Sequence, residues 1–256
     1  MAFATPEADG RPGFYDPADF PFLAVIAARR DALQQEARAL LRRLAMRSFW
    51  QAENPVSLPG VDGQWQQLHL DFCGLRFAVN DRLAPAAAAL IDEIPGMLTA
   101  AYYVLGPRSH ITPHRGIGPN VLRAHYGLIC PEDCRFRVGD EERLWRDGEF
   151  LVFDDTLDHE AWNGSDHQRV IFHIDFFHPP EQDPALMAAQ ARVLRETNIR
   201  KLIAHHALMS AAGLRTDPDL MAQVEATVAT LTATPEGRAR LSQIQAYART
   251  HGYLRG

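Results

Sequence analysis

The middle of the chain, from Thr99 to Pro179, consists of short runs of β-branched, aromatic and leucine residues separated by turn signals. The turn signals are Gly-Pro, Gly-Asp, Asp-Gly and Asn-Gly pairs, and they recur at roughly the interval expected of an antiparallel sandwich or barrel. The pattern predicts strands at Ala101–Leu105, Val121–Ile129, Cys134–Val138, Arg143–Trp145, Phe150–Phe153 and Arg169–Phe177. We therefore predict a mainly β core, a jelly roll, at residues 99–181.

Helical spacing dominates before this core. Residues 16–47 carry apolar residues at mostly helical spacing, with arginines available for a solvated face, which predicts an amphipathic helix. Residues 55–63 are rich in Pro and Gly and predict a loop, Trp65–Phe72 predicts a strand, and the Ala-rich residues 81–94 predict a second helical segment. We expect residues 1–98 to be helical and strand elements that pack on the core.

Residues 182–256 have a different character, with much Ala and no Phe or Trp. Three segments in this region begin with a capping side chain followed by proline, which is typical of helix starts. These starts are Asp183-Pro184, Asp217-Pro218 and Thr234-Pro235. They predict a C-terminal helical extension. Docking on the core and docking on a second copy of the chain, which would make a homo-oligomer, both stay open.

Composition narrows the class of partner. The chain has 256 residues, 46% of them hydrophobic and 23% charged, as in soluble globular proteins. Its formal net charge of -6 argues against nucleic acid as a partner. Three cysteines cannot all pair in disulfides, which argues against a secreted, disulfide-bonded protein. The N-terminus lacks the basic region followed by an apolar run that is typical of a signal peptide. We expect a cytoplasmic protein, with no membrane partner, that binds a small molecule or a peptide.

Two of the predicted strands are apolar on one face and basic on the other. In a strand, successive side chains point to opposite faces, so Arg123 and His125 share a face, as do Arg169 and His173. A barrel interior that gathers arginines must hold an anion, because an unpaired buried guanidinium is too costly to tolerate. A dicarboxylic acid is one such anion.

Histidines are concentrated in the same region, where seven of the eleven lie between positions 110 and 178. Neutral imidazole is the commonest nitrogen ligand of metals in proteins. His114 and His159 are 45 positions apart, so only the tertiary fold could make them ligands of one metal. A histidine on a strand is more often structural, and an arginine on a strand is more often a surface residue, so that interpretation stays open.

Four segments resemble the aspartyl/asparaginyl β-hydroxylase family. They are Ile111–Gly116, Leu122–Leu128, Phe153–Trp162 and Arg169–Pro179. The likeness is dense from about Tyr102 to Pro179 and fainter from Phe14 to Trp65. It implies a double-stranded β-helix, a jelly-roll and cupin-like fold, in an oxygenase that depends on Fe(II), 2-oxoglutarate and O2, with ascorbate supporting the iron in vitro.

The resemblance also implies roles for single residues. His114 and His159 match the iron ligands, and Arg169 matches the partner of the distal carboxylate of 2-oxoglutarate. Arg123 and His125 match positions that line the co-substrate pocket, and Tyr103 stands where relatives can carry a small hydroxyl residue that faces the co-substrate. Many oxygenases of this fold have a carboxylate ligand two residues after the first histidine. Here that residue is Gly116, as the resembled family allows, with water expected in its place.

Several functions fit these residues. By resemblance, the enzyme would hydroxylate an amino acid, free or within a peptide, at its β-carbon. Desaturation, cyclisation and hydroxylation of acyl chains use the same reactive centre and stay open. A cupin-like module that binds a dicarboxylate or a metal without turnover is the main rival. An interaction protein that works through its helical extension is a third hypothesis.

Overall fold

A computed structural model describes residues 11–45, 61–62, 65–72, 75–76, 78–116 and 120–178, and the C-terminal positions 185, 187, 229, 233–235 and 238–239. Most of the predicted helical extension, and Cys73, lie outside the described residues. Of the three predicted helix starts, only the one at Thr234-Pro235 falls on described positions, and there the Arg238 amide donates a helical hydrogen bond to the Thr234 carbonyl (3.0 Å). Met187 packs against a small apolar cluster of Leu98, Val121 and Phe177.

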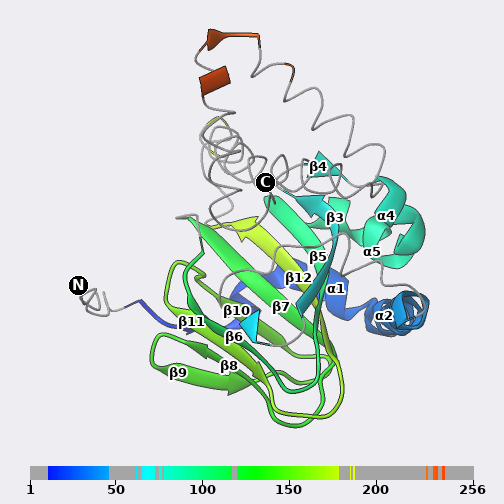
Figure 1. Ribbon diagram of the computed structural model, residues 1–256, viewed down its shortest axis with the longest axis vertical. Helices are drawn as coiled ribbons and strands as arrows, with labels where there is room; N and C mark the ends of the chain where they lie inside the picture. The colour runs from blue at the N-terminus through cyan, green and yellow to red at the C-terminus, as the bar shows by residue number, and fades with distance from the viewer. Residues whose placement is uncertain are drawn as a thin grey trace.

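Two antiparallel β-sheets face each other (Figure 1). In spatial order, the large sheet contains β1 (Phe14–Tyr15), β10 (Phe150–Phe153), β7 (Val121–Ile129), β12 (Arg169–Phe177), β5 (Met97–Leu105), β3 (Trp65–Phe72) and β4 (Leu75–Arg76). The small sheet contains β2 (Val61–Asp62), β6 (Ser109–His114), β11 (His159–Asn163), β8 (Cys134–Val138) and β9 (Glu141–Leu144). This arrangement confirms the predicted double-stranded β-helix. Strands β1, β2 and β3, which precede residue 97, hydrogen bond directly to strands of the core, and β4 pairs with β3.

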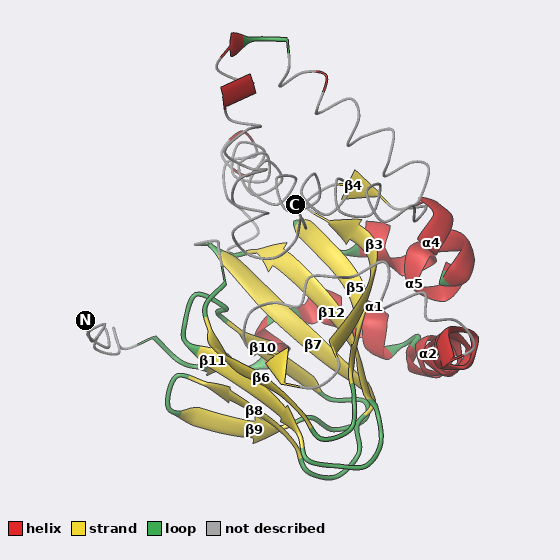
Figure 2. Cartoon of the chain, in the orientation of Figure 1, coloured by secondary structure: helices red, strands yellow, loops and turns green. Residues whose placement is uncertain are grey.

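The described helices cover one face of the large sheet (Figure 2). They are α1 (Ala24–Ala27), α2 (Arg30–Ala45), α4 (Ala78–Leu83) and α5 (Pro85–Leu90), with 3-10 turns at Pro17–Asp19, Pro21–Leu23 and Ile91–Glu93. The apolar face of α2, with Leu33 and Ala37, belongs to the same hydrophobic core as Leu122 and Phe172 of the sheet. Within these ranges, no helix is long and apolar enough to cross a bilayer.

Prolines divide the two predicted helical segments. The segment predicted at residues 16–47 contains two 3-10 turns and a short helix before α2 begins at Arg30. Pro17 and Pro21 each begin a 3-10 turn, because proline has no amide hydrogen and its fixed φ suits the first position of a helical turn. The segment predicted at residues 81–94 is likewise divided, because α4 ends just before Pro85, which begins α5.

The predicted alternation on the two long strands is confirmed. Leu122 and Tyr126 of β7 and Phe172 of β12 belong to the core between the large sheet and the helices. Ile171 belongs to a second core between the two sheets, so Arg169 and His173, which share its face of β12, lie inside the barrel. The basic face of each strand is therefore the interior face.

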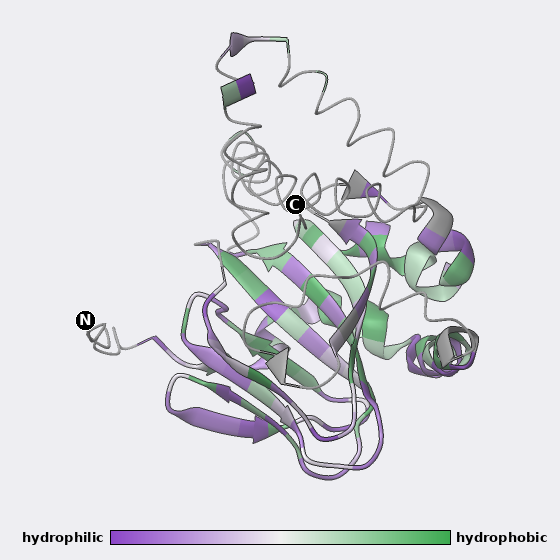
Figure 3. Cartoon of the chain, in the orientation of Figure 1, coloured by the Kyte–Doolittle hydropathy of each residue, from purple (hydrophilic) through white to green (hydrophobic). Residues whose placement is uncertain are grey.

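Five strands of the structure were not predicted from the sequence, and β5 and β9 have other bounds than the predicted ones. The short strands β1, β2 and β4 and the longer β6 and β11 were not predicted as strands, and Val61–Asp62 lies in the segment predicted as a loop. Strand β9 spans Glu141–Leu144 and leaves Trp145, predicted to be in a strand, to turn into the barrel core. All four β9 residues are exposed, and the strand is hydrophilic in Figure 3. A charged edge strand of this kind protects the sheet from pairing with other chains.

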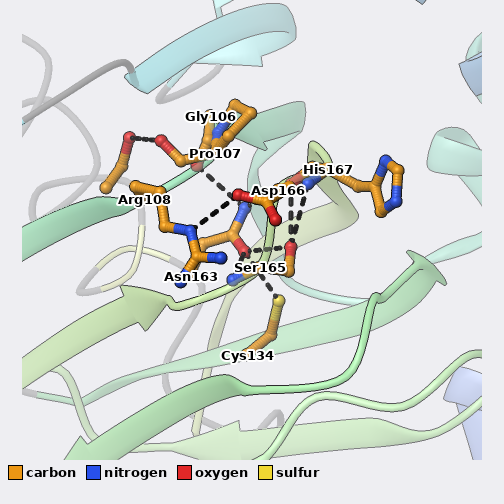
Figure 4. A network of polar contacts seen from close by, with 9 residues as sticks. Gly106, Pro107, Arg108, Cys134, Asn163, Ser165, Asp166 and His167 are labelled. Carbon is orange, nitrogen blue, oxygen red and sulfur yellow. Dashed lines mark hydrogen bonds and ion pairs between the residues drawn. The ribbon is translucent and has the colours of Figure 1, made fainter.

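A buried asparagine fixes the turn that leads into β12 (Figure 4). The Asn163 side-chain amide donates hydrogen bonds to the carbonyls of Leu105 (3.0 Å), Gly106 (2.8 Å) and His167 (2.7 Å). Its side-chain oxygen accepts from the Ser165 hydroxyl at 2.6 Å. Because Arg169 follows this turn directly, Asn163 ties the first residue of β12 to the end of β5.

We expect Asn163→Ala to lower the free energy of unfolding by on the order of 3 kcal/mol, because buried carbonyls would lose their donors. Urea unfolding followed by circular dichroism measures the change. Asp166→Asn is the matched control: Asp166 lies on the same turn, but its ion pair with Arg108 is exposed, so this variant should unfold like the wild type. Equal stability of all three proteins would contradict the assignment.

Candidate active site

His114 and His159 come together inside the barrel. They lie on the adjacent strands β6 and β11, where they are register partners, and their ring centroids are 4.2 Å apart. The next register pair is Ala161 with Ile111. Between these two pairs the chain advances two residues in β11 but three in β6, so β6 contains one extra residue. This β-bulge turns His114 to the interior face that Ile111 also occupies.

Both imidazoles are held through Nδ1 by a backbone carbonyl two residues earlier in the chain. His114 Nδ1 lies 2.8 Å from the Thr112 carbonyl, and His159 Nδ1 lies 2.9 Å from the Leu157 carbonyl. A carbonyl can only accept, so each Nδ1 carries the hydrogen and each Nε2 keeps its lone pair. Within the described part of the chain, neither Nε2 has a hydrogen-bond partner. Carbonyl partners of this kind commonly fix metal-ligating histidines.

The two histidines are neutral at physiological pH. Burial lowers the pKa of His159 to about 3, and burial also lowers the pKa of His114. Protons therefore do not compete with a metal for either Nε2 near pH 7. This pair of nitrogen donors fits Fe(II), which imidazole ligands suit well.

In the described ranges, no third side chain joins His114 and His159 in a group that could hold a metal. Among the described residues, no group of three or more His, Cys, Asp or Glu could hold a metal ion. Gly116 stands where a carboxylate ligand would follow His114, and a Cβ atom added to it would lie 1.8 Å from Asp155 Oδ2. The Gly116 amide also donates to the Asp155 carbonyl at 2.6 Å. The carboxylate of Asp155 therefore fills the space that a side chain at position 116 would need.

We expect Gly116→Ala to lower turnover by at least about tenfold, because the new methyl group would displace Asp155 from its ion pair with Arg123. The matched test is a double-mutant cycle with Asp155→Ala, which removes the colliding carboxylate. Steady-state kinetics should show that the double variant is no worse than Asp155→Ala alone. Additive losses would mean that the collision is not the cause.

Arg123 lies in the interior, but it is already paired with two carboxylates. Its Nη2 is 2.9 Å from Asp155 Oδ2, and its Nε donates to Asp175 Oδ1 at 2.7 Å. Burial raises the pKa of Asp155 to about 6. Burial acts in the same direction on Asp175, but the Arg123 guanidinium and His173 hold the pKa of Asp175 well below its ordinary value. A direct role for Arg123 in co-substrate binding stays a prediction.

Arg169 is the opposite case, a buried guanidinium that has no counterion among the described residues. Its side chain is 2% exposed, and in the described ranges its Nε and Nη1 have no hydrogen-bond partner. Burial lowers the pKa of Arg169 to about 10, which still leaves it charged near pH 7. The nearby thiols of Cys130 and Cys134 do not balance this charge, because burial raises their pKa values to about 12 and about 11. An anion is the partner that such a group requires.

His125 and Tyr103 line the same interior wall. His125 is the register partner of His173, and the centroids of the two rings are 5.3 Å apart. Neither ring nitrogen of His125 has a partner among the described residues, and burial lowers its pKa well below the usual value. The ring of Tyr103 stacks on His173 with centroids 4.2 Å apart. Contact of Tyr103 with the co-substrate stays a prediction.

Three residues that complete this site were not among the predicted site residues. Asp155 and Asp175 hold Arg123, and Trp145 covers Arg169. For Asp175 a signal existed, because strand alternation places it on the interior face with Arg169 and His173. For Asp155 and Trp145, which lie outside strands, the sequence carries no comparable signal.

Buried neutral histidines make the metal-free fold sensitive to acid. Burial lowers the pKa values of His69 and His159 to about 3, whereas the unfolded values lie near 6.5, so the unfolded chain binds more protons below pH 6.5. Each such histidine should therefore lower the free energy of unfolding by about 2 kcal/mol between pH 7 and pH 5. Asp155 acts in the opposite direction, because its folded pKa is raised to about 6 and its protonation favours the folded state.

Urea unfolding at pH 5, 6 and 7 measures this dependence. The loss between pH 7 and pH 5 should be larger in Asp155→Asn, which lacks the opposing carboxyl group. A stability that is constant over this range would contradict the assigned neutral histidines.

Known proteins with similar sequences share this region. The sequence profile described as aspartyl/asparaginyl beta-hydroxylase matches residues 28–179. An ornithine lipid ester-linked acyl 2-hydroxylase from Rhizobium tropici is 35% identical over 174 residues, covering 66% of this chain and 62% of that protein. The aspartyl/asparaginyl beta-hydroxylase of Homo sapiens is 33% identical over 135 residues, covering 49% of this chain and 18% of that protein. The chain thus spans less than two thirds of the length of either relative.

One solved structure with a similar fold is a cupin 2 conserved barrel domain protein from Salinispora arenicola. It has 12% sequence identity and a TM-score of 0.31, covering 52% of this chain and 86% of that chain.

Proposed function

Because the chain belongs to the aspartyl/asparaginyl β-hydroxylase family, we propose that it is an Fe(II)- and 2-oxoglutarate-dependent hydroxylase of an amino acid, free or within a peptide, acting at the β-carbon. His114 and His159 would hold Fe(II), and Arg169 would bind the distal carboxylate of 2-oxoglutarate. One observation carries the proposal: a barrel interior that presents two ligand-ready imidazoles also buries an unpaired guanidinium.

Each side chain of the site has its own role in the proposed reaction. The Thr112 and Leu157 carbonyls fix His114 and His159 so that each offers Nε2 to the metal. Arg169 would orient the dicarboxylate through charge-assisted hydrogen bonds in an interior from which water is excluded. When bound, Fe(II) supplies the oxygen chemistry by which O2 and 2-oxoglutarate yield succinate, CO2 and a hydroxylated C–H position.

The proposal is tested by incubating the purified full chain with Fe(II), ascorbate and 2-oxoglutarate in air. Succinate is measured first, and mass spectrometry then screens amino acids and short peptides for the gain of one oxygen atom. We expect succinate that depends on both Fe(II) and 2-oxoglutarate. Binding of iron and 2-oxoglutarate without succinate, whatever substrate is offered, would instead identify a cupin-like binding module.

Hydroxylation of an acyl chain is the second candidate. The Rhizobium tropici relative, which is named as an acyl 2-hydroxylase, aligns over 66% of this chain. In addition, Arg123 is held by Asp155 and Asp175, so it is not free to bind a charged group of an amino acid substrate. Gain of oxygen by an ester-linked acyl lipid, and not by amino acids or peptides in the same screen, would favour this candidate.

A further inference from the structure

Trp145 packs against two of the residues expected to line the co-substrate pocket, Arg169 and His125. It follows β9, its side chain is buried, and its backbone amide donates to the Cys134 carbonyl at 3.1 Å. The Arg169 guanidinium carbon lies 4.4 Å from the centroid of its ring. The His125 ring lies on the indole with centroids 5.8 Å apart and an interplanar angle of 28°. The indole is therefore part of the wall that surrounds the unpaired guanidinium.

The indole also carries an unused donor. Trp145 is 3% exposed, and no hydrogen-bond partner for its Nε1 exists in the described part of the chain. A buried tryptophan N–H usually has a partner, and so does a buried guanidinium. Among the described residues, Nε1 of Trp145 and both Nε and Nη1 of Arg169 have no hydrogen-bond partner. These donors belong to two side chains that are in direct contact. Unpartnered donors that gather at one place indicate that a ligand supplies the acceptors.

The ligand that satisfies these donors must have acceptors and a negative charge. Arg169 supplies the charge. The thiols of Cys130 and Cys134, which influence its pKa, are neutral because burial raises their own pKa values, so they do not balance this charge. A carboxylate has two oxygens that accept several hydrogen bonds, which suits a fork of guanidinium donors joined by an indole N–H.

We propose that Trp145 is a binding residue for the distal carboxylate of the co-substrate: its ring face supports the Arg169 guanidinium, and its indole N–H donates to the same carboxylate. The inference rests on the proposed function. It assigns to Trp145 part of the selectivity for a dicarboxylic over a monocarboxylic 2-oxo acid, because only the former brings a second carboxylate to Arg169.

The test compares two ligands and two variants. Trp145→Phe keeps an aromatic face on Arg169 but removes the N–H. Trp162→Phe is the matched control, because Trp162 stacks with His110 at 5.0 Å and has the Arg135 guanidinium 5.6 Å from its centroid, but it points to the outer face of the small sheet. Anaerobic calorimetry on the Fe(II)-loaded full chain measures binding of 2-oxoglutarate and of 2-oxopentanoate, which lacks the distal carboxylate. Circular dichroism checks that each variant is folded.

We expect Trp145→Phe to weaken 2-oxoglutarate binding by about tenfold and to leave 2-oxopentanoate binding unchanged, as for loss of one hydrogen bond to a charged group. Trp162→Phe should bind both ligands like the wild type. Wild-type affinity of Trp145→Phe for 2-oxoglutarate, or an equal loss for both ligands, would overturn the role of Trp145 and leave the proposed function intact. Failure of the wild type itself to bind 2-oxoglutarate would overturn the proposed function as well.

Discussion

Replacing His159 with alanine should abolish hydroxylation and lower Fe(II) affinity by more than about 100-fold. Loss of a residue that merely orients a ligand typically costs 10- to 100-fold, and this variant would remove one of the two proposed ligands themselves. No described His, Cys, Asp or Glu stands ready to replace it in a group that could hold a metal. A chelator assay under anaerobic conditions measures the Fe(II) affinity, and succinate formation measures the activity.

His110→Ala is the control for this variant. His110 lies on β6 like His114, but its Nε2 contacts Glu160 at 2.9 Å on the outer side of the small sheet. Its replacement should leave iron binding unchanged. Retention of iron and of turnover by His159→Ala would show that the metal is held elsewhere.

Replacing Arg169 with leucine should raise the KM for 2-oxoglutarate by about 100-fold or more while making the ligand-free protein more stable. The first effect follows because the distal carboxylate would enter a buried site without its cation, and breaking a buried pair costs about 3–5 kcal/mol. The second follows because the unpaired buried guanidinium destabilises the ligand-free fold, and an apolar residue of similar volume does not. Kinetics and urea unfolding on the same preparation separate the two effects.

Arg123→Leu provides the contrast, because Arg123 has two carboxylate partners that its removal would leave buried and unpaired. This variant should be less stable than the wild type, in the direction opposite to Arg169→Leu. If both leucine variants lose stability, Arg169 has a structural counterion and the argument for a bound anion is wrong.

Alternation of side chains predicted the interior wall of the large sheet well. In β7 and β12, large apolar residues on one face and Arg and His on the other follow the strand period, so Arg169 and His173 were assigned to the interior correctly. The bounds of β7, β8, β10 and β12 agree with the predicted ones for the same reason.

The small sheet was harder to predict. Strand β6 contains Pro113 and a bulge, which break the period of two, and the outward residues of β11 are Glu160 and Trp162 rather than a regular polar series. Without register, the alternation of β6 alone does not show that His114 faces inward. The resemblance to a family supplied that assignment, and the register of His114 with His159 in the structure agrees with it.

The ion pairs of the interior arginines could not be predicted from the sequence either. Two interior arginines look alike in the strand pattern, yet Arg123 meets carboxylates from a loop and from β12, whereas Arg169 meets the face of Trp145. Which guanidinium is neutralised depends on contacts between residues far apart in the chain, and these exist only after folding.

The placement of the two histidines on paired strands links metal chemistry to the architecture of the small sheet. An ion bound by both would cross-link β6 and β11 at positions 45 residues apart in the chain, next to the β-bulge that interrupts their regular pairing. Chelators would then loosen this corner of the barrel as well as stop turnover, so iron supply would govern how long the protein survives proteolysis.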